Sequence, residues 1–386
     1  MHFRYRARGG LALSGLLTAA VALAGCGSDE AEPAGKRIAE PIAVTYDGGI
    51  HVLDGATLEL RGSTALDGFN RLNPAGDDRH LMVSHKDAFR VYDATEAAFT
   101  DIEFPGAKPG HVVRHAGRTV LFADGPGEVT SFDPALLSGG KPATQVYKSA
   151  APHHGVAIEL ADGSLVVTLG TEEKRTGIAV LDAQRKEIAR NEDCPGVHGE
   201  AVAQGDAVVV GCQTGALVYR AGVITKVAAP TPYGRIGNQA GSPESTVVLG
   251  DYKKDKDAEL ERPQQVSLID TATGTLRLVD IGTSYTFRSL ARGPRGEALV
   301  LGTDGRIHVI DPVAGTLTRT IPVIDPWQEP LKWQQARPAL FVRDAVAYVS
   351  DPATKKVHRV DLTTGTITAS VALPDSPNEL SGVLVH

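Results

Sequence analysis

Histidine is the residue type in this sequence whose placement most clearly suggests chemistry. Five of the twelve histidines fall in three short segments, and in each segment a proline stands one to three residues before the first histidine. The segments are KPGHVVRH at 108–115, APHHGVA at 151–157 and CPGVHGEA at 194–201. Imidazole nitrogens are common ligands of Zn²⁺, and three that converge leave a fourth position for a carboxylate, a further histidine or water. The pattern therefore predicts a zinc site. Its ligands would be His111, either His153 or His154, and His198.

Two neighbours of these histidines leave alternatives open. Glu200 is two residues after His198, so on a strand the two side chains point to the same side, and Glu200 is a candidate fourth ligand. His153 and His154 are adjacent and should point to opposite sides of a strand. We favour His154, because a glycine follows it as one follows His198. In the alternative interpretation, these histidines hydrogen-bond across a channel and hold water there.

The elements that must position these residues belong to a repeat of short strands. A strand that ends in an apolar residue and Asp, followed by a turn and another strand, recurs at intervals of 38 to 50 residues. The marking positions are Asp54, Asp93, Asp133, Asp182, Arg220, Asp270, Asp311 and Asp361. Each unit also has a preceding pair of alternating strands, and four short strands in about 40 residues are typical of a propeller blade. We therefore predict an all-β protein, a β-propeller with eight blades. Seven blades is the alternative, because the fifth unit is degenerate and the sixth and eighth carry insertions.

The ends of the repeat predict how the propeller closes. The first unit lacks an innermost strand, and the C-terminus supplies a spare one at 379–385. The last strand should therefore complete the first blade and hide the free sheet edges. Hairpin glycines at similar distances after the three histidine segments place the histidines at one level of adjacent inner strands, near one mouth of the central channel.

The aspartates and histidines of the third strands are expected to have structural roles. An Asp at a strand end commonly accepts hydrogen bonds from backbone N–H groups of the following turn, so we do not expect the repeated aspartates to be catalytic. His51, His308 and His358 lie in these third strands, and we expect them on the outer surface of the blades.

Residues 1–25 are typical of a bacterial lipoprotein signal peptide. A basic start and an apolar run precede the tetrapeptide LAGC, a lipobox that ends at Cys26. We expect cleavage before Cys26 and lipid attachment to its sulfur, which would anchor the protein on the outer face of a membrane. A plain secretory signal is the alternative. Residues 26–41 are small and polar and should form a flexible tether, and 42–386 should form a single propeller domain.

The remaining two cysteines fit an extracytoplasmic location. Cys194 and Cys212 are 18 residues apart. In an oxidising compartment an even number of cysteines favours a disulfide over a pair of metal thiolates. We therefore expect a Cys194–Cys212 disulfide.

The charge balance excludes one class of partner. The net charge is −7, and it becomes −10 once the three arginines of the signal peptide are removed. An acidic surface without a basic patch repels a phosphate backbone, so we expect no nucleic-acid binding. We expect a monomer.

The histidine segments resemble a known family. PGHVVRHAGRTVLFADG at 109–125, PHHGVA and CPGVHGEA, with GFNRLNPAGDDRHLMVS before them, resemble the AztD family of periplasmic zinc metallochaperones from bacterial zinc-uptake operons. The resemblance extends over nearly all of 41–386. It implies a zinc-binding propeller that hands Zn²⁺ to the zinc-specific solute-binding protein of an ABC transporter, with ligands at the PGH, HHG and HGE histidines. Two departures are that 27–41 contains no histidine, which puts a second zinc site in doubt, and that a lipobox replaces a plain periplasmic signal.

Two other classes of function are alternatives to a zinc carrier. A zinc-dependent hydrolase of the lactonase type could use Glu200 as general base. No HExxH, Gly-x-Ser-x-Gly or Cys–His nucleophile pattern is present, and two tryptophans are too few for a quinoprotein propeller. A lipid-anchored scaffold could use Trp327 and Trp333, which lie in one insertion, as a protein contact. We therefore expect a binding protein and not an enzyme.

Overall fold

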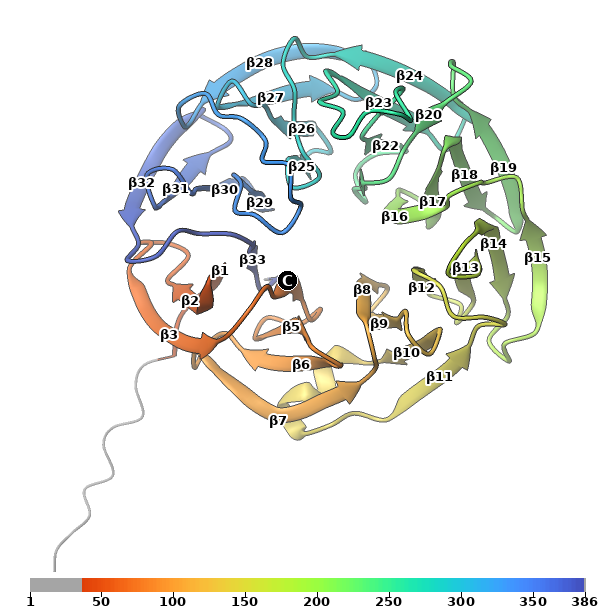
Figure 1. The fold of residues 1–386 in the computed structure, drawn as a ribbon, viewed down its shortest axis with the longest axis horizontal. Helices are drawn as coiled ribbons and strands as arrows, with labels where there is room; N and C mark the ends of the chain where they lie inside the picture. The colour runs from red at the N-terminus through yellow and green to blue at the C-terminus, as the bar shows by residue number, and fades with distance from the viewer. Residues whose placement is uncertain (1–36, 385–386) are drawn as a thin grey trace, which may run out of the picture. The chain divides into compact units, whose positions relative to one another are not determined.

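The repeat folds into eight antiparallel sheets that form the blades of a β-propeller (Figure 1). The computed structural model describes residues 37–384; the predicted signal peptide, the predicted lipidation at Cys26 and most of the predicted tether lie outside the described residues. The eight-blade prediction is confirmed, and the seven-blade alternative is excluded. Within 37–384, no helix has both the length and the apolar character needed to cross a membrane.

Each blade is described here from its innermost strand, at the centre of the ring, to its outermost strand. Blades 1 to 4 contain, in that order, β33 (Leu380–Gly382), β1 (Ile42–Tyr46), β2 (Gly48–Leu53) and β3 (Leu60–Leu66); β4 (Arg71–Pro74), β5 (His80–His85), β6 (Ala88–Asp93) and β7 (Ala98–Pro105); β8 (Pro109–His115), β9 (Arg118–Ala123), β10 (Glu128–Phe132) and β11 (Thr144–Lys148); and β12 (Ala157–Glu159), β13 (Leu165–Gly170), β14 (Arg175–Leu181) and β15 (Glu187–Asn191).

Blades 5 to 8 continue around the ring. They contain β16 (His198–Ala203), β17 (Ala207–Cys212), β18 (Thr214–Arg220) and β19 (Val223–Ala228), with β20 (Gly234–Arg235) beside β18; β21 (Gln239–Ala240), β22 (Val247–Gly250), β23 (Gln265–Asp270) and β24 (Thr275–Asp280); β25 (Leu290–Arg292), β26 (Ala298–Leu301), β27 (Arg306–Asp311) and β28 (Thr316–Pro322); and β29 (Leu340–Arg343), β30 (Val346–Asp351), β31 (Lys356–Asp361) and β32 (Thr366–Ala372). One 3₁₀ helix, Pro134–Gly139, joins β10 to β11.

The last strand closes the ring as predicted. β33 pairs antiparallel with β1, with Ile42 opposite Gly382 and Val44 opposite Leu380. Blade 1 is thus built from both ends of the domain (Figure 1). The pairing satisfies backbone groups that an open sheet would leave at its edge.

The core lies between the blades, because both faces of a middle strand pack against neighbouring blades. All six residues of β17 are buried, with no polar alternation. This packing overturns one prediction. His51, His308 and His358 are only 2%, 4% and 9% exposed, so they lie between blades and not on the outer surface.

The repeated aspartates cap the turn between the third and fourth strands, as predicted. Asp361 Oδ1, for instance, accepts hydrogen bonds from the backbone N–H groups of Thr363 at 2.7 Å and Thr364 at 3.0 Å. The degenerate fifth unit needs no such cap. Its β18–β19 hairpin has a two-residue loop, Ala221-Gly222, in which both residues have positive φ (48° and 85°), as in a type I′ turn.

The end of the predicted tether already contacts the propeller. Ile38 is 6% exposed, and its backbone N–H donates to the carbonyl of Thr95 at 2.9 Å. The ordered domain therefore includes residues a few positions before the predicted boundary at 42.

Candidate metal centre

Three of the predicted ligands meet beside the central channel, each from a different blade. His111 lies in β8, His154 just before β12, and His198 at the start of β16. One nitrogen from each ring lies within 4.8 Å of the other two, and the ring centroids are 5.0 to 5.3 Å apart. We call these three residues the histidine cluster. Adjacent blades 3, 4 and 5 thus bring the three sequence segments to one place.

Glycines in the PGH and HGE motifs make room for the groups that hold the histidines. A Cβ at Gly110 would collide with the carboxylate of Asp124. Gly199 has a φ of +70°, and a Cβ there would collide with the side chain of Gln239 and the carbonyl of Gly237. Only glycine fits both the backbone conformation and the close approach at this position.

Hydrogen bonds fix the tautomers of two cluster histidines. His198 Nδ1 lies 2.6 Å from the carbonyl oxygen of Gly237, which only accepts, so Nδ1 carries the proton. His154 Nδ1 is likewise 2.6 Å from Asp124 Oδ2 and donates to that carboxylate. Both Nε2 atoms then hold lone pairs, and they face each other at 3.1 Å. Such an arrangement is repulsive unless a proton or a metal ion lies between the two nitrogens. It matches the usual pattern in which a metal-bound imidazole donates its other N–H to a carboxylate or carbonyl.

Burial and nearby charges keep His111 and His198 neutral. Burial, followed by the fields of His154, Arg235 and Arg175, lowers the pKa of His198 to about 3, although the hydrogen bond to Gly237 opposes the shift. Burial and the neighbouring imidazoles also hold the pKa of His111 well below its usual range. Because an imidazole must be deprotonated to coordinate a metal, these shifts favour ligation at neutral pH.

The structure places Glu200 beside His111 and outside the group of three nitrogens. A β-bulge at His198–Glu200 breaks the alternation on which the sequence prediction depended. Glu200 Oε2 lies 3.8 Å from Nδ1 of His111. Burial raises the pKa of Glu200 to about 8, and the nearby Arg114 only partly opposes this. The Glu200 carboxyl is therefore largely protonated at neutral pH.

His153 points away from the cluster. It is 1% exposed, with Nδ1 2.9 Å from the carbonyl of Ala151 and Nε2 3.0 Å from Thr168 Oγ1. Its ring packs edge-on against Phe122. Both nitrogens are occupied, so of the two adjacent histidines only His154 is free to bind a metal.

A cavity of about 410 Å³ opens over the cluster. The His154 side chain is 45% exposed, so an approaching molecule can reach at least one ligand directly. The cavity is lined by three basic residues, three acidic residues and an aromatic residue from the insertion before β29. They are Arg71, Arg235, Lys253, Asp251, Glu261, Glu329 and Trp333.

Sequence reasoning missed the residues that orient the ligands. Asp124 holds His154, and Asp251 holds the backbone that carries the Gly237 carbonyl: its Oδ1 accepts from the N–H groups of Gly237 at 2.6 Å and Asn238 at 3.1 Å. Asp124 directly follows β9, the hairpin partner of β8, so the register of that hairpin could have placed it near His111. Nothing local in the sequence connects Asp251 with His198.

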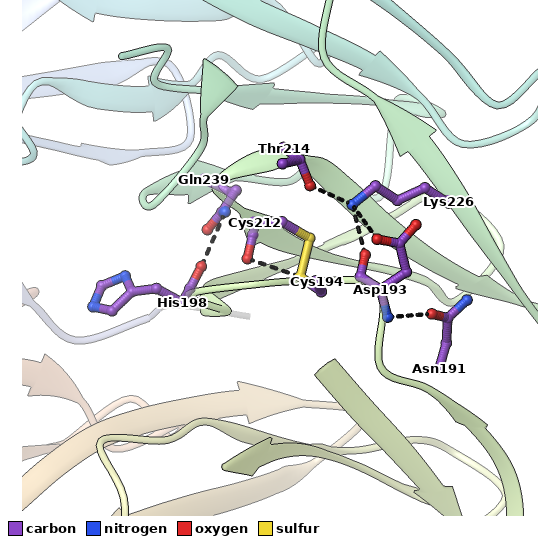
Figure 2. Close-up of a disulfide and its surroundings, with 9 residues drawn as sticks. Asn191, Asp193, Cys194, His198, Cys212, Thr214, Lys226 and Gln239 are labelled. Atoms are coloured by element: carbon purple, nitrogen blue, oxygen red, sulfur yellow. Dashed lines mark hydrogen bonds and ion pairs between the residues drawn. A yellow bond between two sulfur atoms is a disulfide. The ribbon is translucent and has the colours of Figure 1, made fainter. Parts of the chain in front are cut away.

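A disulfide supports the strand that carries His198. Cys194 and Cys212 are bonded, as predicted. The bond joins the segment before β16 to the end of β17, and the His198 imidazole projects away from it (Figure 2). The cross-link therefore fixes the start of β16 without occupying the metal site.

Comparisons with known proteins confirm the resemblance that the motifs indicate. No family model matches the chain. A curated relative, the zinc chaperone AztD of Citrobacter koseri, is 28% identical over 298 residues, which cover 73% of this chain and 67% of the relative.

Solved structures show the same fold. Apo AztD from Citrobacter koseri has a TM-score of 0.76 and 23% identity, with 89% of this chain and 96% of that chain covered. A second structure of Citrobacter koseri AztD has a TM-score of 0.75 and 23% identity, with coverage of 90% and 98%. The dihydro-heme d1 dehydrogenase NirN is more distant, with a TM-score of 0.59, 14% identity and coverage of 89% and 75%.

Proposed function

We propose that this protein is an extracytoplasmic zinc carrier that holds one Zn²⁺ at His111, His154 and His198. Its curated relative is named a zinc chaperone, and the fold matches structures of that protein. The cluster supplies three imidazole nitrogens, which suit Zn²⁺ as ligands. In this proposal zinc is the cargo and not a resident cofactor.

The observation that carries the proposal is the pair of facing Nε2 atoms. They lie 3.1 Å apart, and each ring has its Nδ1 proton committed to an acceptor. A Zn²⁺ bound at about 2.0–2.1 Å from each nitrogen would turn this repulsion into coordination. Two nitrogens of one tetrahedral zinc normally stand slightly farther apart than this, so a small opening of the cluster on loading is expected.

The position of the cluster suits release as well as binding. Three protein ligands leave a fourth coordination position open, and the exposed side of His154 faces the cavity. A receiver can therefore displace the histidines one at a time. A closed four-ligand structural site would not allow this exchange.

We further propose that the receiver is the zinc-specific solute-binding protein of an ABC transporter and that a lipid on Cys26 anchors the carrier outside the cell membrane. The lipobox supports the anchor, and the Cys194–Cys212 disulfide fits an oxidising compartment. Mass spectrometry of the membrane-extracted protein should find a diacylglycerol-type modification on Cys26. An unmodified N-terminus from a plain signal cleavage would contradict the anchor.

The metal site is tested by stripping the mature protein with a chelator and titrating it with zinc. We expect one equivalent to bind, and His111→Ala combined with His198→Ala to abolish that binding. The matched control combines His85→Ala with His115→Ala, which removes two partly exposed histidines outside the cluster. Equal zinc uptake by the two double variants would contradict the proposed site.

The carrier role is tested by co-purification with a zinc-binding solute-binding protein of the same cell. Complex formation should depend on zinc loading and fail with the His111→Ala, His198→Ala variant. Association that is independent of zinc would favour the scaffold interpretation instead.

A zinc hydrolase is the second candidate, because Glu200 lies 3.8 Å from His111. Burial raises the pKa of Glu200 to about 8, and a carboxyl whose pKa lies near neutral can serve as a general acid or base. Screening zinc-loaded protein against lactones and esters separates the two functions. A hydrolase should turn over substrate and lose that turnover in Glu200→Gln.

A further inference from the structure

Three basic side chains near the histidine cluster have no partner of opposite charge. Among residues 37–384, Arg175, Arg235 and Lys253 make no side-chain hydrogen bond or ion pair, and Nη1 of Arg175 is buried without a hydrogen-bond acceptor. Arg235 and Lys253 line the cavity over the cluster. We call these three residues the cationic rim.

The backbone brings two of these cations together. Arg235 and Lys253 face each other in an isolated antiparallel bridge, with backbone N–H···O distances of 2.7 and 2.9 Å. Like charges directly opposite each other destabilise a pair of strands. Among residues 37–384 no carboxylate forms an ion pair with either side chain, so both charges are available to an added anion.

The rim lies close to the metal ligands. The guanidinium of Arg235 packs against Gly237, where a Cβ would collide with it, and the carbonyl of Gly237 holds His198. The backbone carbonyl of Arg175 accepts from the N–H of Gly196 at 2.9 Å, two residues before His198. Arg235 and Arg175 therefore both lie beside the segments that hold this ligand.

The acids of the same cavity are already engaged by other groups. Asp251 accepts from backbone N–H groups of Gly237 and Asn238. Glu261 accepts from the backbone N–H groups of Lys254 and Asp255. Glu329 is paired with Arg337 at 2.6 Å. These acids keep their charge, but each is held by a fixed partner. Arg235 and Lys253 are cavity charges without a close partner among the described residues, and an added anion can pair with them.

We propose that the cationic rim receives an acidic side chain of the protein that takes the zinc, so that its carboxylate enters as the fourth ligand. This inference rests on the proposed carrier function. The carboxylate oxygen bonds to zinc before a histidine nitrogen leaves, and the exchange requires no electron transfer. Asp and Glu oxygens are among the usual ligands of tetrahedral zinc. Cations beside the site attract the incoming anion and weaken the hold on a dication.

The surroundings of the rim fit a protein better than a small free acid. Trp333 lines the same cavity, and Trp333 and Leu331 are 49% and 61% exposed. Tryptophan at the edge of a charged pocket is a common anchor in protein interfaces. A free acid would make no use of this apolar edge.

The inference is tested by stopped-flow transfer of zinc from the loaded mature protein to two synthetic peptides. Each peptide carries three histidines, and the fourth ligand is Asp in one and Asn in the other. At low ionic strength, the wild type should deliver zinc to the Asp peptide at least about tenfold faster than to the Asn peptide. Arg235→Gln with Lys253→Gln should reduce that ratio to near one, and Arg235→Lys with native Lys253 should retain it. Lys148→Gln with Lys186→Gln, which removes two exposed charges on the outer parts of blades 3 and 4, is the matched control and should behave as wild type.

Three other results would contradict, respectively, the role of the rim, the assignment of a protein receiver and the carrier function. A wild type that loads zinc and shows the same ratio as the Arg235→Gln, Lys253→Gln variant contradicts the role of the rim. If this variant slows removal of zinc by nitrilotriacetate but leaves the peptide ratio intact, the rim serves small free acids and the protein assignment is wrong. A wild type that does not load zinc contradicts the proposed function itself, and this inference falls with it.

Discussion

The histidine cluster and the buried histidines of the blades differ in how their nitrogens are used. His51 is buried, and its two nitrogens lie 2.7 Å from Ser63 Oγ and 3.2 Å from Asp375 Oδ2. His153 likewise has both nitrogens bonded. In the cluster, His154 and His198 each have one nitrogen bonded to an acceptor and the other facing a second lone pair.

This difference teaches how to distinguish a structural histidine from a ligand. Burial does not separate them, since it lowers the pKa of His51 as it does that of His198. An unpartnered nitrogen alone does not separate them either, since His308 Nδ1 is buried without a hydrogen-bond partner. What separates the cluster is that the Nε2 atoms of two imidazoles face each other at 3.1 Å. A buried polar atom without a partner is costly, so an imidazole nitrogen held toward other imidazoles indicates a missing cation.

The sharpest way to break this comparison uses the adjacent pair His153 and His154. His154→Ala should lower zinc affinity by more than about 100-fold, because loss of a ligand exceeds the usual effect of losing an outer hydrogen bond. His153→Ala should leave zinc affinity within a few-fold of wild type. It should lower the free energy of unfolding by about 1–3 kcal/mol or more, because Thr168 Oγ1 and the Ala151 carbonyl lose a buried partner.

Competition titration with a fluorescent zinc indicator and urea unfolding of the stripped protein measure the two effects. Each variant serves as the control for the other. Loss of zinc binding in His153→Ala with native stability would reverse the assignment.

A smaller effect is expected from the residue that orients His154. Asp124→Asn keeps the size of the side chain but weakens the acceptor that fixes the Nδ1 proton. We expect zinc affinity to fall about 10- to 100-fold, as is usual for partners of metal-bound histidines. Asp206→Asn, at the acid beside His115, is the matched control. Equal affinities for the two variants would mean that the tautomer of His154 does not matter.

A separate prediction concerns how the free energy of unfolding depends on pH. Burial lowers the pKa of His51, His111 and His198 in the folded protein, so below about pH 6.5 the unfolded chain binds more protons than the native one. The stripped protein should therefore become less stable as pH falls from 7 to 5, by up to about 1.4 kcal/mol per pH unit for each such group. Glu200 acts in the opposite direction, since its pKa is raised to about 8.

Urea unfolding at several pH values checks this sign. Glu200→Gln removes the opposing group and should steepen the loss of stability below pH 6.5. A stripped protein whose stability rises toward pH 5 would contradict the assignment of buried neutral histidines.

Much of the fold could be predicted from the sequence, because a propeller repeats one local pattern. The Asp turns and the eight units follow from spacing within about 50 residues. The closure by β33 follows from comparing the two ends of the repeat, since the first unit lacks the strand that the C-terminus supplies. The burial of His51, His308 and His358 could not be predicted from alternation alone. A blade packs on both faces, so the outward side of a strand meets another blade and not solvent.

The sequence predicts the place of a site residue where this depends only on its position along a regular strand. It does not predict that place where the backbone is irregular. The register of the inner strands brings His111, His154 and His198 together. The place of Glu200 depends on a bulge at the positive-φ Gly199, which no alternation rule anticipates. The cationic rim joins segments that are remote along the chain, so its charge pattern appears only in the folded protein.

The central claim is that the histidine cluster holds zinc. Anomalous diffraction at the zinc edge from crystals of the zinc-loaded protein tests it most directly. We expect a single strong peak within about 2.0–2.1 Å of Nε2 of His154 and His198, with His111 as the third ligand. A peak elsewhere with the cluster unliganded, or no ordered zinc at full loading, would contradict the account.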